Sequence, residues 1–240
     1  MSTTTSVPPV ARSKGSFGDR PAVRLPWPAL FGPIPLADAQ WLDGQVGERS
    51  VREHETVYRR GEAATGVVML LEGQVVIGHA EAGQAMKAER VLHGPAWLDL
   101  SSAWCHGQFV GDAVAQSASV VATLPLAALR SVLGQRPALA LRFVDVVVHE
   151  VCRLGAQTHE LMHKDAPARL AAWLQRQIDG SAQAVLRLAE RKRDIASQLG
   201  MTPETLSRLM RSLSEQGLIS VDGYTVRVLD PRGLRRLAGT

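Results

Sequence analysis

From Leu25 to Pro125, short apolar segments are separated by Gly, Pro and polar residues at intervals of about 8–12 positions, with little helical periodicity. This pattern predicts a small all-β sandwich or roll. The predicted strands are Thr56–Tyr58, Val67–Leu71, Val75–Ile77, Arg90–Leu92 and Val120–Leu124. Tight turns are expected at Gly61, Gly66, Gly73 and Gly83.

After Pro125 the pattern changes to a helical one. Leu126–Leu133 predicts a short helix, and Pro137 suits the first turn of a longer helix that extends to residue 164. Along the longer helix apolar positions recur at alternating steps of four and three, the spacing of a heptad seam, with Val144 and Val151 at a positions. The seam comprises Ala140, Val144, Val147, Val151, Leu154, Thr158 and Leu161. It predicts a parallel two-helix dimer; a helix packed on its own β domain is the alternative.

These patterns divide the chain into four parts. Residues 1–24 are rich in Ser, Thr, Pro and Gly and are expected to form a disordered tail. Residues 25–136 are predicted to form the β domain, residues 137–164 the dimerisation helix, and residues 165–240 a separate small domain. Asp165-Ala166-Pro167 predicts a hinge and the cap of a following helix, Ala168–Ile178. The fold class is therefore α+β.

Composition excludes several classes of protein. The chain has 240 residues, of which 45% are hydrophobic and 21% charged, the proportions of an ordinary globular protein. No apolar run approaches the roughly 18 residues that span a bilayer, and the N-terminus lacks the apolar core of a signal peptide. Two cysteines, Cys105 and Cys152, are too few for a disulfide scaffold or a four-cysteine iron–sulfur cluster. A reduced cytoplasmic protein is expected.

Positive charge is concentrated near the C-terminus. Residues 1–163 carry 14 basic and 15 acidic side chains, whereas residues 164–240 carry 13 basic and 8 acidic ones. A cationic third attached to a nearly neutral body favours a polyanionic partner, most simply nucleic acid. A solvated basic surface without a partner has the same composition.

Residues 192–211 match the requirements of a helix-turn-helix. A small residue is needed where the two helices nearly touch, and Ala196 stands there; a glycine is favoured at the turn, and Gly200 stands there. The positions that must be apolar hold Ile195, Leu199, Met201, Leu206 and Leu209. An arbitrary pair of helices would predict none of these seven matches, so the segment predicts DNA binding.

The second helix of this motif has its own start signal and an exposed polar face. Thr202 is expected to cap it and Pro203 to occupy its first position. The inward stripe is predicted to be Leu206, Leu209, Met210 and Leu213, and the opposite face to carry Glu204, Ser207, Arg208 and Arg211. Gly217 is expected to end the helix. Leu218–Val221 and Tyr224–Leu229, joined by Asp222-Gly223, predict a hairpin of the kind called a wing.

With these motifs the chain resembles the Crp/Fnr family of bacterial transcription regulators over about residues 25–240. Arg60-Gly61-Glu62 followed by Leu71-Glu72-Gly73 is similar to the family's β-roll signature. The resemblance implies a cyclic-nucleotide-binding-like β-roll, a long dimerisation helix, a C-terminal winged helix-turn-helix, and RNA polymerase as a partner. The stretch Glu204–Arg208 resembles the reading helix of the Fnr branch; the Crp branch has Arg where this chain has Pro203.

By that resemblance Glu204, Ser207 and Arg208 read bases in a palindrome of TTGAT-like half-sites. The chemistry agrees, because Arg208 can donate two hydrogen bonds to guanine O6 and N7, Glu204 can accept from a cytosine amine, and Ser207 can meet a thymine edge. Four further side chains are expected to contact phosphates without reading sequence. They are Thr202, Thr205, Arg211 and Lys192.

Cyclic AMP is not the expected signal. The family members that bind it use a Gly-Glu pair for the ribose and an Arg for the phosphate. At the positions of that Gly-Glu pair this chain has Leu98 and Asp99. No Arg or Lys occurs between Asp99 and Leu124, and a buried phosphodiester without a cation would be poorly stabilised. Trp97 and Asp99 remain weak ligand-binding candidates, Trp97 being more typical of a core aromatic. Cys105-His106 could ligate haem or a metal, although a surface loop pair without that role is commoner.

The sequence also contains the pattern H-E-x-x-H, in His159-Glu160-Leu161-Met162-His163. In zinc hydrolases two such histidines bind the metal and the glutamate acts as base. A third ligand would have to be an acid such as Glu190, because no histidine follows His163. In the heptad frame both histidines lie on the solvent face, so no metal site is expected. The alternatives to a homodimeric transcription regulator are this zinc hydrolase, and a ligand-binding module whose helix-turn-helix contacts only protein.

Overall fold

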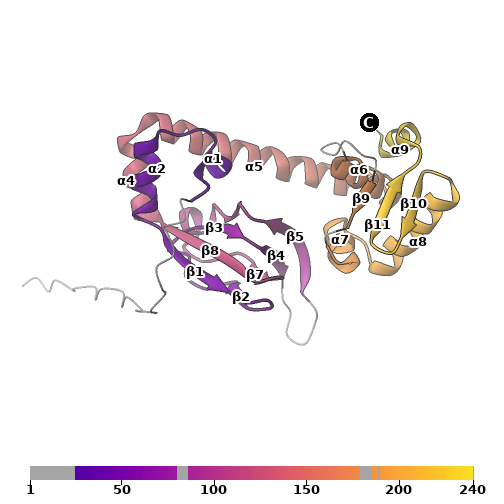
Figure 1. Cartoon of the computed structure of the whole chain (residues 1–240), viewed down its shortest axis with the longest axis horizontal. Coiled ribbons are helices and arrows are strands. Elements are labelled where there is room, and N and C mark those ends of the chain that lie inside the picture. Colours follow the sequence, from indigo (N-terminus) through magenta and orange to yellow (C-terminus); the bar gives the residue numbers. More distant parts are fainter. Residues whose placement is uncertain (1–24, 80–85, 179–184, 189, 240) are drawn as a thin grey trace, which may run out of the picture.

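A computed structural model describes residues 25–79, 86–178, 185–188 and 190–239. The predicted N-terminal tail and the turn at Gly83 lie outside these residues. The N-terminal half is a β-roll flanked by short helices, and the C-terminal unit is small and mixed; a long helix, α5, connects the two (Figure 1). In the described part of the chain, no helix has the length and apolarity needed to cross a membrane.

The roll consists of two four-stranded antiparallel sheets, with strand orders β1-β8-β3-β6 and β2-β7-β4-β5. The strands are β1 (Gly47–Val51), β2 (Thr56–Tyr58), β3 (Gly66–Glu72), β4 (Gln74–His79), β5 (Lys87–His93), β6 (Ala96–Asp99), β7 (Asp112–Ala115) and β8 (Ser119–Pro125). Each of the five predicted strands is present.

The continuously apolar sequence of β3 is explained by burial of both faces of the strand. Val68 and Leu70 point between the two sheets, whereas Val67 and Met69 pack under the helices on the outer face. Because both faces of the strand are buried, no polar alternation is required. Gly66, predicted as a turn, is instead the first residue of this strand.

Among the described residues, five helices accompany the roll: α1 (Trp27–Phe31), α2 (Leu36–Asp43), α3 (Ser102–Cys105), α4 (Leu126–Gln135) and α5 (Pro137–His163). Helices α4 and α5 confirm the predictions, and the first three were missed. The strands β1, β6 and β7 were also missed. Strand β1 reads Gly-Glu-Arg-Ser-Val and is mostly exposed; its partner β8 stabilises it through antiparallel pairing (Glu48 opposite Ala122) rather than an apolar pattern of its own.

The buried apolar residues of helix α5 lie near its start. Leu139 and Phe143 are buried against the roll, whereas the seam residues Val144, Val151 and Leu154 are exposed, Val151 by 62%. In the described chain this apolar stripe therefore has no partner over most of its length. The alternative of a seam buried on its own β domain does not describe this helix.

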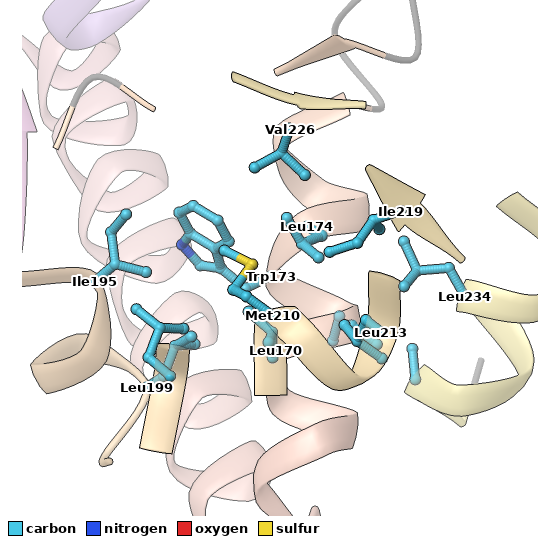
Figure 2. Packing of buried hydrophobic residues seen from close by; sticks show 14 of the residues in the cluster. Leu170, Trp173, Leu174, Ile195, Leu199, Met210, Leu213, Ile219, Val226 and Leu234 are labelled. Carbon is cyan, nitrogen blue, oxygen red and sulfur yellow. The ribbon is translucent and has the colours of Figure 1, made fainter. Parts of the chain in front are cut away.

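The C-terminal unit is a helix-turn-helix followed by a hairpin. Its elements are α6 (Ala166–Ile178), β9 (Val185–Arg187), α7 (Lys192–Gln198), α8 (Pro203–Glu215), β10 (Ile219–Asp222), β11 (Thr225–Val228) and α9 (Pro231–Ala238), with the sheet order β10-β11-β9. Figure 2 shows how Leu170 and Leu174 of α6 converge with side chains of the other elements. The unit therefore has a hydrophobic core separate from those of the roll.

Local details of this unit differ from the predictions. Helix α6 starts at Ala166, two residues early, because Asp165 accepts a hydrogen bond from the Ala168 N–H (2.9 Å) and caps it there. In the hairpin Asp222 pairs with Thr225, so the two-residue loop is Gly223-Tyr224 rather than Asp222-Gly223. Strand β9 and helix α9 were not predicted.

The unit also touches the roll. Helix α7 packs against β5, and the Gln116 side chain of the β7–β8 loop donates to the buried carboxylate of Asp194 on α7 (3.4 Å). Asp194 was not predicted to be buried, because its partner is distant in the sequence.

Candidate DNA interface

The turn between α7 and α8 has the geometry that the sequence predicts. Gly200 adopts a φ of +61°, in the left-handed region that glycine tolerates best. The Met201 N–H donates to the Ala196 carbonyl (3.0 Å), which closes the end of α7. Ala196 is fully buried, so a larger side chain there would collide with the neighbouring core. Both requirements of the motif are confirmed.

The start of α8 is also confirmed. Pro203 occupies the first turn, and the Thr202 hydroxyl accepts a hydrogen bond from the Thr205 N–H (3.2 Å). This bond satisfies one of the amide groups that a helix start leaves without a partner. Thr202 therefore determines where the helix begins and, with it, the position of the next residues.

Helix α8 is divided into an inner and an outer face. Leu206, Met210 and Leu213 are buried, and Leu209 packs partly buried against the same core. The predicted outer residues Glu204, Ser207, Arg208 and Arg211 are exposed, as is Thr202; Thr205 is half-buried. Among the described residues no ion pair engages Arg208 or Arg211. A carboxylate, a hydroxyl and two guanidinium groups thus face away from the protein on one side of the helix.

Electrostatics favour the ionised form of Glu204. The pKa of the Glu204 carboxylate lies below its usual value, first because of its own backbone N–H and then because of the Thr202 hydroxyl. At neutral pH the group is therefore an acceptor only, suited to a cytosine amine. Lys192, the remaining predicted contact, is exposed at the first position of α7.

The wing adds two exposed side chains that the sequence analysis did not select. Tyr224, in the loop of the hairpin, is 59% exposed, and Arg227 on β11 is exposed. The sequence did contain a signal for the exposure of Tyr224. An aromatic ring next to Gly223 in a two-residue hairpin loop is too far from the core to be buried.

The weak ligand candidates in the roll have structural partners. The Trp97 indole N–H donates to the Leu30 carbonyl (3.0 Å), and its ring meets Phe31 edge-on (centroids 5.2 Å apart). Asp99 accepts hydrogen bonds from the backbone N–H of Ser101 (3.0 Å) and Ser102 (2.7 Å) and from the Ser102 hydroxyl (2.6 Å). Trp97 therefore holds β6 against α1, and Asp99 holds the start of α3.

Side chains of the two sheets pack against one another in the interior of the roll. Tyr58 stacks on Phe109 with ring centroids 4.0 Å apart, and burial raises the pKa of the Tyr58 hydroxyl. Arg90 of β5 is ion-paired with Glu150 of α5 and donates to the Trp97 carbonyl (3.4 Å). The guanidinium of Arg90 is thus already engaged with a carboxylate on α5.

The H-E-x-x-H residues form no metal centre. His159 and His163 are exposed, with ring centroids 4.4 Å apart, whereas Glu160 pairs with Arg176 (2.5 Å) and Lys164 (3.6 Å). Glu190, the only suggested third ligand, is hydrogen-bonded to Gln198, and burial raises its pKa. Across the described ranges no group of three or more potential ligands could hold a metal ion. Cys105 is an exposed free thiol, as is Cys152.

A β-roll, a long exposed helix and a helix-turn-helix with an exposed polar face define a winged-helix DNA-binding regulator. Two family models match the chain: a cyclic nucleotide-binding domain at residues 48–136 and a Crp-like helix-turn-helix domain at residues 168–237. The chain belongs to the Crp/Fnr family of transcription regulators.

Individual relatives agree with this assignment. The chain is 27% identical over 214 residues to a transcriptional regulatory protein, btr, of Bordetella pertussis, covering 86% of this chain and 87% of the relative. It is 24% identical over 199 residues to an anaerobic regulatory protein of Haemophilus influenzae (80% and 77% covered). FixK2 from Bradyrhizobium japonicum shares the fold, with a TM-score of 0.68 at 21% identity over 80% of this chain and 96% of that one.

Proposed function

We propose that this protein is a homodimeric regulator that binds a palindromic DNA site with TTGAT-like half-sites and responds to a signal other than cyclic AMP. In this proposal Glu204, Ser207 and Arg208 read base edges in the major groove, while Thr202, Thr205, Arg211 and Lys192 contact phosphates. RNA polymerase is the expected protein partner, and the cytoplasm the expected location. The sensor comprises residues 25–136, the dimerisation helix residues 137–164, and the DNA-binding domain residues 165–240.

One observation carries the proposal: Glu204, Ser207 and Arg208 are exposed together on the face of α8 opposite its buried stripe. Arg208 has no ion pair within the described structure, so its guanidinium is available to a base. A bidentate contact between arginine and guanine discriminates against other bases by about 1–3 kcal/mol.

Dimerisation is supported by the exposed seam on α5. Val144, Val151 and Leu154 recur at heptad spacing, and an exposed stripe of this length is costly in water unless a second copy covers it. A second helix-turn-helix would then be available for the second half-site, about 34 Å away.

A signal other than cyclic AMP is supported by the interior of the roll. Tyr58 and Phe109 stack on one another in the interior of the roll, and Arg90 is paired with Glu150. A cyclic nucleotide would have to displace this pair to obtain a cation for its phosphate.

The test is a gel-shift series with a TTGAT-type palindrome and a scrambled duplex of equal length. The wild type should prefer the palindrome. Arg208→Ala should lose about 10-fold or more of that preference, as expected for one bidentate contact. Arg211→Ala is the matched control: it should weaken binding to both duplexes alike and reduce the salt dependence by about one phosphate contact. An Arg208→Ala protein that keeps the full preference would overturn the assignment.

A further inference from the structure

One arginine connects three elements at the base of the DNA-binding domain. Arg169 lies on α6, and its guanidinium donates from Nε to the Leu199 carbonyl (2.8 Å), from Nη1 to the Lys164 carbonyl (2.7 Å) and from Nη2 to the Gly200 carbonyl (3.4 Å). No carboxylate is paired with it among the described residues. The side chain is partly buried.

All three carbonyls lie at, or directly after, the C-terminal end of a helix. Lys164 is the C-terminal cap of α5, whereas Leu199 is the cap of α7 and Gly200 follows it in the turn. Carbonyls at a helix C-terminus lack intrahelical partners and carry partial negative charge, so a cation is stabilising there. A single guanidinium thus caps both the dimerisation helix and the first helix of the helix-turn-helix.

The same two helix ends are also in direct contact. A Cβ added at Gly200 would lie 2.9 Å from Cδ2 of Leu161 on the last turn of α5. The turn of the helix-turn-helix therefore rests on the end of the dimerisation helix, and Arg169 connects the two from the side.

The covalent connection between these parts is short but weakly constrained. Between α5 and α6 only Lys164 and Asp165 are outside helices, and Lys164 is extended (φ −102°, ψ 139°). Rotation about this extended residue would swing the whole C-terminal unit relative to α5. Besides Arg169 and the contact of Gly200 with Leu161, the Glu160–Arg176 ion pair bridges the break, and Arg176 is 53% exposed, which weakens such a pair. The packing of α7 against β5 joins the unit to the roll rather than to the end of α5.

We propose that Arg169 is a positioning residue for DNA recognition: it holds the helix-turn-helix at a fixed angle to the dimerisation helix and thereby determines the separation of the two reading helices in the dimer. Arg169 does not touch DNA in this role, because its donors are directed at backbone carbonyls. The inference rests on the proposed dimeric DNA-binding function.

A positioning role and a merely stabilising role predict different results. A residue that only stabilises the fold would change affinity for all DNA sites in proportion to the folded fraction. A residue that holds the angle controls which spacing between half-sites the dimer accepts, because inserting one base pair shifts and rotates one half-site relative to the other.

The first experiment measures spacing preference. The palindrome that the wild type selects from random duplexes is compared with versions carrying one base pair more or fewer at its centre. The wild type should bind the altered spacings at least about 10-fold more weakly. The measured quantity is the ratio of the affinity for the selected spacing to the affinity for an altered spacing. For Arg169→Ala this ratio should fall to about 3 or less, because the affinity for the selected spacing drops more than the affinity for the others.

Three further variants make the test specific. Arg169→Lys keeps the charge but lacks the forked geometry, so its ratio should be intermediate. Arg236→Ala, which removes a 76% exposed arginine of the same domain, should keep the wild-type ratio. Circular dichroism and thermal unfolding show whether Arg169→Ala folds. If it does not, the spacing preferences of Arg169→Lys and Arg169→Gln are compared with that of the wild type instead. A folded Arg169 variant with the wild-type ratio would overturn the proposal.

A second experiment needs no DNA. Spin labels are attached at Cys152 on α5 and at Glu215→Cys on α8, in a Cys105→Ser background, and labelled chains are diluted with unlabelled cysteine-free ones. The wild type should give a narrow distance distribution, and Arg169→Ala a clearly broader or shifted one. Identical distributions would exclude a positioning role even if the DNA site proposed above were wrong. Failure of the wild type to prefer any palindrome would instead refute the proposed function.

Discussion

The carboxylate of Glu160 on α5 lies 2.5 Å from the guanidinium of Arg176 on α6, across the break between the two helices. Lys164 approaches the same carboxylate to 3.6 Å. The glutamate that an H-E-x-x-H motif would use as a catalytic base is therefore one partner of an ion pair between α5 and α6.

This pair leads to the first prediction. Glu160→Gln should lower the free energy of unfolding by no more than about 1 kcal/mol, because Arg176 is more than half exposed and the pair is screened by water and salt. Urea unfolding measures the change, with Glu215→Gln, an exposed carboxylate on α8, as the matched control. Zinc should produce no hydrolytic activity in either protein; zinc-dependent hydrolysis that disappears in Glu160→Gln would contradict this interpretation of the motif.

The second prediction concerns the seam on α5. Val151→Glu places a charge at an a position, where a dimer would bury it. The dimer dissociation constant should rise by about 100-fold or more, equivalent to about 3 kcal/mol, as measured by sedimentation equilibrium. Cys152→Glu adds the same charge one residue later, off the seam and on an exposed side chain. An equal rise of the dissociation constant in both variants would argue against the seam as the dimer interface.

The third prediction concerns the start of α8. Thr202→Ala removes the hydroxyl that accepts from the Thr205 N–H, and should lower the free energy of unfolding by about 1 kcal/mol. Ser207→Ala, at an exposed position inside the same helix, serves as the control and should cause no loss, since alanine favours helices. Thermal or urea unfolding of both variants distinguishes a cap from a general effect of losing a hydroxyl on α8.

The fourth prediction is a pH dependence at Glu150. Hydrogen bonding from Arg153 is the largest cause of a pKa below the usual 4.5, and the nearby Arg90 guanidinium adds to it. Because the folded-state pKa is the lower one, the stabilisation is complete above the unfolded-state pKa and is lost as pH falls through the folded-state pKa. The wild type should therefore exceed Glu150→Gln in unfolding free energy at pH 6–7, with a difference that shrinks below about pH 4.5.

Urea unfolding of both proteins between pH 3.5 and 7 measures this difference. Glu48→Gln, an exposed carboxylate on β1, is the control for general acid effects and should show a small, nearly constant difference from the wild type. A difference between the wild type and Glu150→Gln that does not vary with pH would show that the Arg90–Glu150–Arg153 group does not stabilise the ionised carboxylate.

The sequence by itself determined the elements whose requirements are local. Ala196, Gly200 and Thr202 were each assigned a role from their positions within one 20-residue stretch, and each has that role in the structure. Helix α5 and its exposed seam followed in the same way, because helical periodicity and the proline at its start are properties of neighbouring residues.

The tertiary structure alone decided the features that depend on distant partners. Strand β1 is polar and exists through its pairing with β8, which follows about seventy residues later. Asp194 is buried beside Gln116, Glu160 meets Arg176, and Arg169 reaches the ends of α5 and α7. Such contacts depend on how packed elements meet in space, and no local periodicity encodes them. For this reason the sequence predicted which face of α8 is exposed, whereas only the folded chain shows how that helix is held against α5.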